Sequence, residues 1–171
     1  MSGRKGLVTL QGNPMTLVGS PVESGDTAPN ATVLDGDLSP VSLASFTGKI
    51  RVLLTVPSVD TSVCDAEVRR FNQEAAALGD DVVVLAVSMD LPFAQQRWCG
   101  AAGIDRVKVL SDHRDAAVGL AYGVLMEEVR LLARAVFVID RTDRVCHSQL
   151  VREVADAPDY DAVLAAVTAA L

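Results

Sequence analysis

The sequence has few of the features that mark secreted, membrane or metal-binding proteins. Only three of its 171 residues are cysteines, Cys64, Cys99 and Cys146, and their odd number and long spacing argue against a secreted disulfide framework and against paired zinc ligands. No apolar stretch approaches membrane-spanning length, and the N-terminal segment lacks the apolar core of a signal peptide. We therefore expect a soluble, cytoplasmic protein with no membrane contact.

Positive charge is also scarce. The chain has 15 Lys and Arg against 22 Asp and Glu, a net charge of −7, and no local run of basic residues. Phosphate backbones are bound by clustered Lys and Arg, so this balance argues against a nucleic-acid partner. Hydrophobic residues make up 50% of the sequence, which is enough for a sizeable core, and we expect residues 1–171 to form a single domain.

Runs of β-branched residues alternate with helical patterns along the chain. Residues 50–56 (IRVLLTV) and 81–88 (DVVVLAVS) are continuous apolar runs, typical of strands covered on both faces, and an amphipathic helix beginning near Ser62 separates them. This order predicts a right-handed βαβ unit with parallel strands. Shorter extended pieces are expected at residues 31–34 and 41–43, within a loop rich in Gly, Pro, Ser and Asp.

Other patterns predict two hairpins and three more helices. A Gly-Asn turn signal between β-rich runs predicts an N-terminal hairpin at residues 7–19. Further along the chain we expect helices at 92–103, 112–123 and 158–171, and a hairpin of strands at 134–140 and 144–151. Together these elements predict an α/β fold with a mixed central β-sheet, helices on both faces and an N-terminal β-hairpin, a layout that resembles the thioredoxin fold.

The string PSVDTSVC, residues 57–64, joins the first apolar run to the helix that follows it. Cys64 lies on the apolar stripe of this helix, so its sulfur is expected to face inward at the first turn. Unpaired backbone N–H groups and the positive end of the helix dipole favour a thiolate there, which is the nucleophilic form. Asp60 or Thr61 can cap the helix, the Thr61 hydroxyl can also face the sulfur or a substrate, and Pro57 can shield the pocket. An inert buried cysteine is the alternative.

This string resembles the active-site loop of the peroxiredoxins, and its Ser-Val-Asp-Thr-x-x-Cys form is similar to that of the thiol peroxidase subgroup, the atypical two-cysteine enzymes. Other segments resemble the same subgroup in the same order: LQGNPMTLVG, an N-terminal hairpin; DLPFAQQRWCGAAG, a helix with the second cysteine; LLARAVFVID; and SQLVREVADAPDYDAVLAA. The resemblance therefore covers nearly the whole chain.

The resemblance implies a role for each of five residues. Cys64 is the peroxidatic cysteine, Thr61 and Pro57 belong to its pocket, Arg134 faces the thiolate, and Cys99 is the resolving cysteine that forms an intrachain Cys64–Cys99 disulfide. An arginine at this place would stabilise the thiolate and hydrogen-bond the peroxide oxygens. Because a disulfide requires Cα atoms within about 7 Å of each other, we expect the helix start at Cys64 and the helix around Cys99 to unwind locally on oxidation.

The function that the resemblance implies is reduction of hydrogen peroxide and organic hydroperoxides, with thioredoxin as the reductant and a homodimer as the assembly. No cofactor and no metal are implied.

The chain departs from the subgroup in two places. Acidic Asp65 and Glu67 follow Cys64 and are expected to compete with its thiolate for positive potential, and the segment before Arg134, GVLMEEVR, is shorter and acidic.

Other functions remain open. A redox-sensing binding module would use the same disulfide to switch a partner surface, and sustained turnover with thioredoxin, thioredoxin reductase and NADPH separates it from an enzyme. A cysteine hydrolase needs a base, but His113 and His147 lie in no recognisable partner motif, and the absence of Cys-x-x-Cys argues against a dithiol oxidoreductase. Cys146 is expected to be a packed or partly exposed strand cysteine, and a minor alternative resolving residue.

Overall fold

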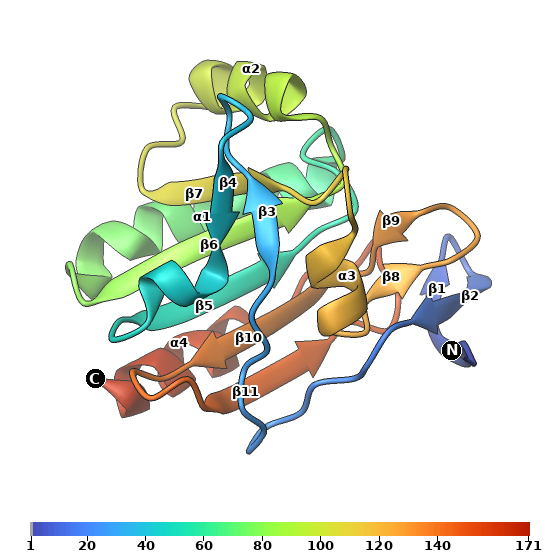
Figure 1. The fold of residues 1–171 in the computed structure, drawn as a ribbon. Helices are drawn as coiled ribbons and strands as arrows, with labels where there is room; N and C mark the ends of the chain where they lie inside the picture. Colours follow the sequence, from blue (N-terminus) through green and yellow to red (C-terminus); the bar gives the residue numbers. More distant parts are fainter. Residues whose placement is uncertain (1) are drawn as a thin grey trace.

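A seven-stranded mixed sheet forms the centre of the protein (Figure 1), in a computed structural model that describes residues 2–171. Its strand order is β11-β10-β5-β6-β7-β3-β4. The bounds are β3 (Thr32–Leu34), β4 (Pro40–Ser42), β5 (Ile50–Thr55), β6 (Val82–Ser88), β7 (Val107–Ser111), β10 (Ala135–Ile139) and β11 (Val145–Leu150). Strands β5, β6 and β7 are parallel, whereas β10 pairs antiparallel with both β5 and β11.

Two helices cover one face of this sheet. They are α1 (Ser62–Leu78) and α4 (Tyr160–Ala170), which lie together behind the sheet in Figure 1. Phe71 of α1 and Val167 of α4 pack on alternate residues of the central strands, such as Val52 and Val138. All six residues of β5 are buried, because both faces of the strand are covered, as expected for a continuous apolar run.

The other face carries shorter elements. A 3₁₀ helix (Leu43–Phe46), the helix α3 (Ala117–Ala121) and the N-terminal hairpin pack there around residues such as Leu53 and Phe137. The helix α2 (Pro92–Ala102) follows β6 and lies across the β7 side of the sheet (Figure 1). Among residues 2–171, no helix is both long enough and apolar enough to cross a membrane.

The N-terminal hairpin belongs to a second, four-stranded sheet. Its strands, in the order β1-β2-β8-β9, are β1 (Arg4–Leu10), β2 (Asn13–Val18), β8 (Leu125–Met126) and β9 (Leu131–Leu132). Gln11 and Gly12 at the tip both have positive φ, 51° and 79°, as a type I′ hairpin turn requires. The carboxylate of Glu153 accepts hydrogen bonds from the Thr9 hydroxyl (2.5 Å) and from the N–H groups of Gln11 (3.0 Å) and Gly12 (3.1 Å). The hairpin is thereby fixed to the chain that follows β11.

The predicted fold class is confirmed, with two local differences. The helix expected at 112–123 is reduced to α3, because the Asp112 carboxylate accepts hydrogen bonds from the N–H groups of Val118 (3.1 Å) and Gly119 (2.9 Å) and Ala116 takes a left-handed conformation before the helix begins. No strand was predicted near the acidic segment GVLMEEVR, yet this segment contains β8 and is followed directly by β9, and both strands extend the small sheet.

Candidate active site

The candidate site begins where β5 ends and the chain turns into α1. Thr61, rather than Asp60, is the N-cap of α1: its backbone is extended and its side-chain oxygen accepts a hydrogen bond from the Cys64 N–H at 3.4 Å. The Thr61 hydroxyl in turn donates to the Ser58 carbonyl oxygen at 3.1 Å. Thr61 therefore fixes the first turn of the helix through both its donor and its acceptor.

Asp90, which was not among the residues predicted for the site, organises the loop before this helix. Its carboxylate accepts hydrogen bonds from the Ser58 hydroxyl (2.7 Å), the Val59 N–H (2.9 Å) and the Ser88 hydroxyl (2.6 Å). Asp90 follows β6, the parallel neighbour of β5, so both strands deliver their carboxyl ends to one edge of the sheet. An acidic residue directly after a predicted parallel strand was the available signal.

The structure brings Cys64 and Arg134 together in a buried pair. Cys64 has 0% and Arg134 1% of its surface exposed, and Nη2 of Arg134 lies 3.2 Å from the sulfur of Cys64. The other guanidinium nitrogens are also bonded: Nε donates to the Val154 carbonyl oxygen at 2.9 Å, and Nη1 donates to the carboxylate of Glu67. Three bonds thus hold the guanidinium plane against the sulfur.

Glu67 is the acidic partner of this arginine. It is fully buried on α1, one of its oxygens has no hydrogen-bond partner, and burial raises its pKa to about 7 although Arg134 opposes the rise. Burial alone would lower the pKa of Arg134, but the charges of Glu67 and Cys64 reverse that effect and raise it, so the arginine stays charged. Glu67 and the sulfur therefore face one shared positive charge.

A cavity of about 220 Å³ opens beside this pair. Five of its residues come from the loop and helix start or are the arginine itself: Pro57, Thr61, Ser62, Val63 and Arg134. The remainder of the wall is supplied by the hairpin and by the chain after β11, through residues that include Leu10, Gln11, Val154 and Ala155. The cavity thus combines a cationic end at Arg134 with largely apolar walls.

The other two cysteines lie elsewhere, and all three are free thiols. Cys99, on α2, lines a separate cavity of about 220 Å³ beside Gly36 and Lys108, and partial burial raises its pKa. Cys146, on β11, is exposed and its thiol donates to the Val138 carbonyl oxygen at 3.3 Å. Of the three thiols in the described part of the chain, that of Cys64 is the one bonded to an arginine.

Two other arrangements receive no support from the described residues. Within residues 2–171, no group of three or more His, Cys, Asp or Glu side chains is placed to hold a metal ion. The hydrogen-bond partner of the Cys64 sulfur in this part of the chain is Arg134, and neither His113 nor His147 contacts it. No histidine base is therefore hydrogen-bonded to Cys64 among the described residues.

Comparison with known proteins agrees with this geometry. The family model described as Redoxin matches residues 23–164. A thiol peroxidase of Halalkalibacterium halodurans is 57% identical over 164 residues, which cover 96% of this chain and 98% of that protein. The chain belongs to the thiol peroxidases of the redoxin family. A second thiol peroxidase, from Staphylococcus aureus, is 52% identical over 159 residues, covering 93% of this chain and 96% of that protein.

Solved structures of peroxiredoxins and thiol peroxidases have the same fold as this thiol peroxidase. A peroxiredoxin-like protein from Aquifex aeolicus superposes with a TM-score of 0.90 at 42% sequence identity, covering 99% of this chain and 100% of that one. A thiol peroxidase from Chromobacterium violaceum superposes with a TM-score of 0.84 at 20% identity over 95% of each chain, a likeness of fold. The thioredoxin-like architecture expected from the sequence is thus shared with peroxiredoxins.

Proposed function

We propose that Cys64 is the peroxidatic cysteine of this thiol peroxidase and reduces hydrogen peroxide and organic hydroperoxides. Its thiolate attacks the terminal peroxide oxygen, the O–O bond breaks, and the departing oxygen takes a proton and leaves as water or an alcohol. Cys64 becomes a sulfenic acid. The observation that carries the proposal is the 3.2 Å contact between Arg134 Nη2 and the Cys64 sulfur in a fully buried pair.

The surroundings of Cys64 favour the charges that this reaction needs. Cys64 lies in the first turn of α1, at the positive end of the helix dipole, and Nη2 of Arg134 lies 3.2 Å from its sulfur. As the O–O bond breaks, negative charge moves onto the leaving oxygen, which a fixed cation stabilises strongly where water is excluded. Pro57 and Thr61 contribute walls of the pocket, and Arg134 is its polar end.

The walls of the cavity support organic hydroperoxides among its substrates. Leu10, Val63 and Val154 line the cavity with apolar side chains. An alkyl group placed there would leave water while the peroxide oxygens bind Arg134. We therefore propose that both hydrogen peroxide and small alkyl hydroperoxides react with Cys64.

Cys99 is proposed to complete the cycle as the resolving cysteine. Its thiol condenses with the Cys64 sulfenic acid, which releases water and forms an intrachain disulfide that thioredoxin reduces by thiol–disulfide exchange. Because Cys99 lines a cavity separate from the one beside the Cys64–Arg134 pair, the helix start at Cys64 and the end of α2 must move first. A homodimer and a cytoplasmic location complete the proposal, on the basis of family membership.

A coupled assay with thioredoxin, thioredoxin reductase and NADPH tests this function. We expect hydroperoxide-dependent NADPH oxidation that is abolished in Cys64→Ser and reduced to a single turnover in Cys99→Ser, while the matched control Cys146→Ser retains the activity of the parent. Turnover by Cys64→Ser would contradict the proposal. Disulfide formation without sustained NADPH oxidation would instead favour the redox-sensing module. Light scattering of the reduced protein tests the homodimer.

A further inference from the structure

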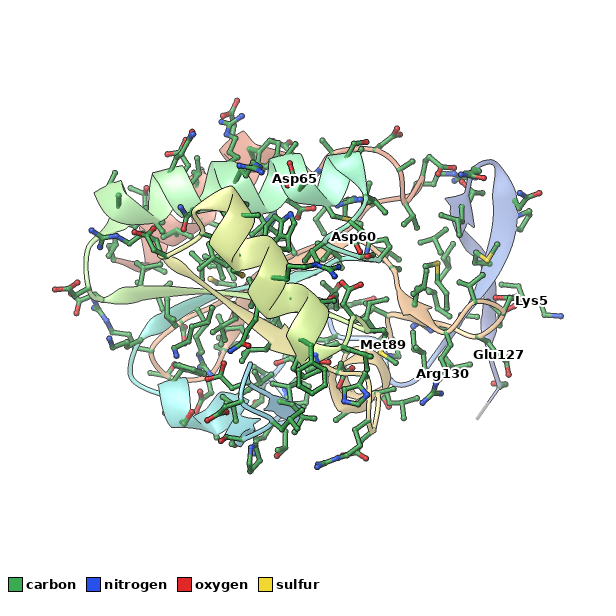
Figure 2. All side chains as sticks on the ribbon, turned by 90° about the horizontal axis from the view of Figure 1, so that it is seen from above. Lys5, Asp60, Asp65, Met89, Glu127 and Arg130 are labelled. Carbon is green, nitrogen blue, oxygen red and sulfur yellow. The ribbon has the colours of Figure 1, made fainter. Side chains whose placement is uncertain are left out.

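A group of hydrogen bonds joins the residue after Cys64 to the residue before Cys99. The indole N–H of Trp98 on α2 donates to Oδ1 of Asp65 on α1 at 2.8 Å. The other oxygen of Asp65 accepts from Nε of Arg69 at 2.8 Å, and Nη1 of Arg69 donates to the Ala102 carbonyl oxygen at 3.2 Å. We call Asp65, Arg69, Trp98 and Ala102 the clasp. Figure 2 shows Asp65 near the start of α1, with α2 next to it.

The clasp holds the C-terminal half of α2 against α1. Gln95, one turn earlier, is buried and donates to the Ser88 hydroxyl and to the Leu110 carbonyl oxygen, both at 2.9 Å, which anchors the helix to β6 and β7. Beyond Gln95 the helix contains Gly100, a poor helix former whose side-chain position faces open space. The clasp therefore supplies side-chain hydrogen bonds from α1 to residues 98 and 102, on both sides of Cys99, and Asn72 of α1 holds the chain just beyond α2 through the N–H groups of Asp105 and Arg106.

The clasp also keeps the two cysteines apart. While it is closed, the Cys64 sulfur is bonded to Arg134 and Cys99 lies in its own cavity beside Gly36. A disulfide between them requires the first turn of α1 and the end of α2 to change position. Since Asp65 and Trp98 are the direct chain neighbours of the two cysteines, that movement must break the bond between them.

We propose that Asp65 and Trp98 are positioning residues that slow resolution of the Cys64 sulfenic acid. The inference rests on the proposed function, because it assigns a rate to the step between Cys64 and Cys99. The sulfenic acid has two fates: condensation with the Cys99 thiol, which gives the disulfide and water, or reaction with a second hydroperoxide, which gives the sulfinic acid and an alcohol or water. A closed clasp lengthens the exposure of the sulfenic acid to the second reaction.

The chemistry of the acceptor makes this bond a strong one. The hydrogen bond from Arg69, and then that from Trp98, hold the pKa of Asp65 below its usual value, so its carboxylate is charged at neutral pH. Hydrogen bonds to a charged acceptor are stronger than those between neutral groups. Removing either end should therefore raise the rate of disulfide formation about tenfold.

Two variants remove opposite ends of the bond. Trp98→Phe removes the donor and keeps the charge at Asp65, and Asp65→Ala removes the acceptor and leaves the indole. Glu74→Gln is the matched control, because Glu74 lies on the same helix and pairs with Arg70 at 3.8 Å, within α1. Each reduced protein is treated with a series of hydroperoxide concentrations, and intact-mass spectrometry measures the ratio of disulfide to sulfinic acid. In Asp65→Ala, which keeps the only tryptophan of the sequence, fluorescence also measures the rate at which α2 moves.

In both variants, the hydroperoxide concentration that converts half of Cys64 to the sulfinic acid should be about tenfold higher than in the parent. In the control this concentration should equal that of the parent. The double variant should change no further than either single one, since both remove one interaction. Parent-like overoxidation of Asp65→Ala, or additive effects, would overturn the inference and leave the proposed function intact. Absence of a Cys64–Cys99 disulfide in the parent would overturn both.

Discussion

The parent protein is expected to become less stable as the pH rises towards neutrality, because of Glu67. The variant Glu67→Gln should not show this decrease in stability. Glutamine keeps the volume of the side chain and an oxygen that can accept the hydrogen bond from Arg134, but it cannot ionise. Glu67 is fully buried, and burial raises its pKa from 4.5 to about 7. The folded protein therefore retains a proton on Glu67 in a range of pH where the unfolded chain has lost it.

The sign and size of the effect follow from that difference. Between pH 4.5 and about 7 the folded state binds more protons than the unfolded state, so the free energy of unfolding falls as the pH rises through this window and is level above it. At about 1.4 kcal/mol for each pKa unit, the loss in the parent amounts to about 3 kcal/mol. Glu67→Gln lacks this slope.

Urea unfolding of the reduced protein, measured on both sides of the window, tests this reasoning. The stability of Glu67→Gln relative to the parent should increase by about 3 kcal/mol from the acidic to the alkaline side. Glu74→Gln, a change at a half-exposed position of the same helix, is the control and should run parallel to the parent. Parallel curves for Glu67→Gln and the parent would refute the assignment of a raised pKa to Glu67.

Three further changes have defined outcomes. Phe71→Ala empties a core position that is 1% exposed and should cost about 3–5 kcal/mol in urea unfolding. Gly100→Ala fills open space on α2 and stabilises the helix by about 1 kcal/mol, so disulfide formation in stopped flow should slow about fivefold. Hydrogen bonds hold the pKa of Glu153 at about 2, and Glu153→Gln weakens them, so hydrogen exchange at the backbone amides of Gln11 and Gly12 should be faster in the variant. In the parent, the protection of these amides should persist until the pH falls towards about 2.

The central fold could be predicted because its signals are local. The apolar runs at β5 and β6 and the amphipathic α1 between them are each long enough to show their period, and the parallel pairing follows from their order. β8 and β9 have two residues each, which is too short for an alternating pattern, and their pairing depends on contact with the distant hairpin. Such strands cannot be recognised from their own residues.

In the candidate site, too, contacts between neighbours in the chain could be predicted and contacts between distant residues could not. A cap at Asp60 or Thr61 could be predicted, because a cap and its helix are adjacent in the chain, and the structure selects Thr61. Arg134 is 70 residues from Cys64, so spacing gave no information about their contact, and its place near the thiol came from resemblance alone. Asp65 and Glu67 were both expected to compete with the thiolate, but Asp65 bonds to Trp98 on another helix, and Glu67 bonds to Arg134. Packing decided between two acids that the sequence presents alike.

The most direct test of the central claim is a non-reducing peptide map by mass spectrometry, after treatment of the reduced protein with one equivalent of hydrogen peroxide. The account predicts a peptide pair cross-linked between Cys64 and Cys99 of one chain, with Cys146 unmodified. A cross-link from Cys64 to Cys146 would contradict the resolving role of Cys99. If Cys64 remained a free thiol after this treatment, the peroxidase mechanism built on Cys64 and Arg134 would be wrong.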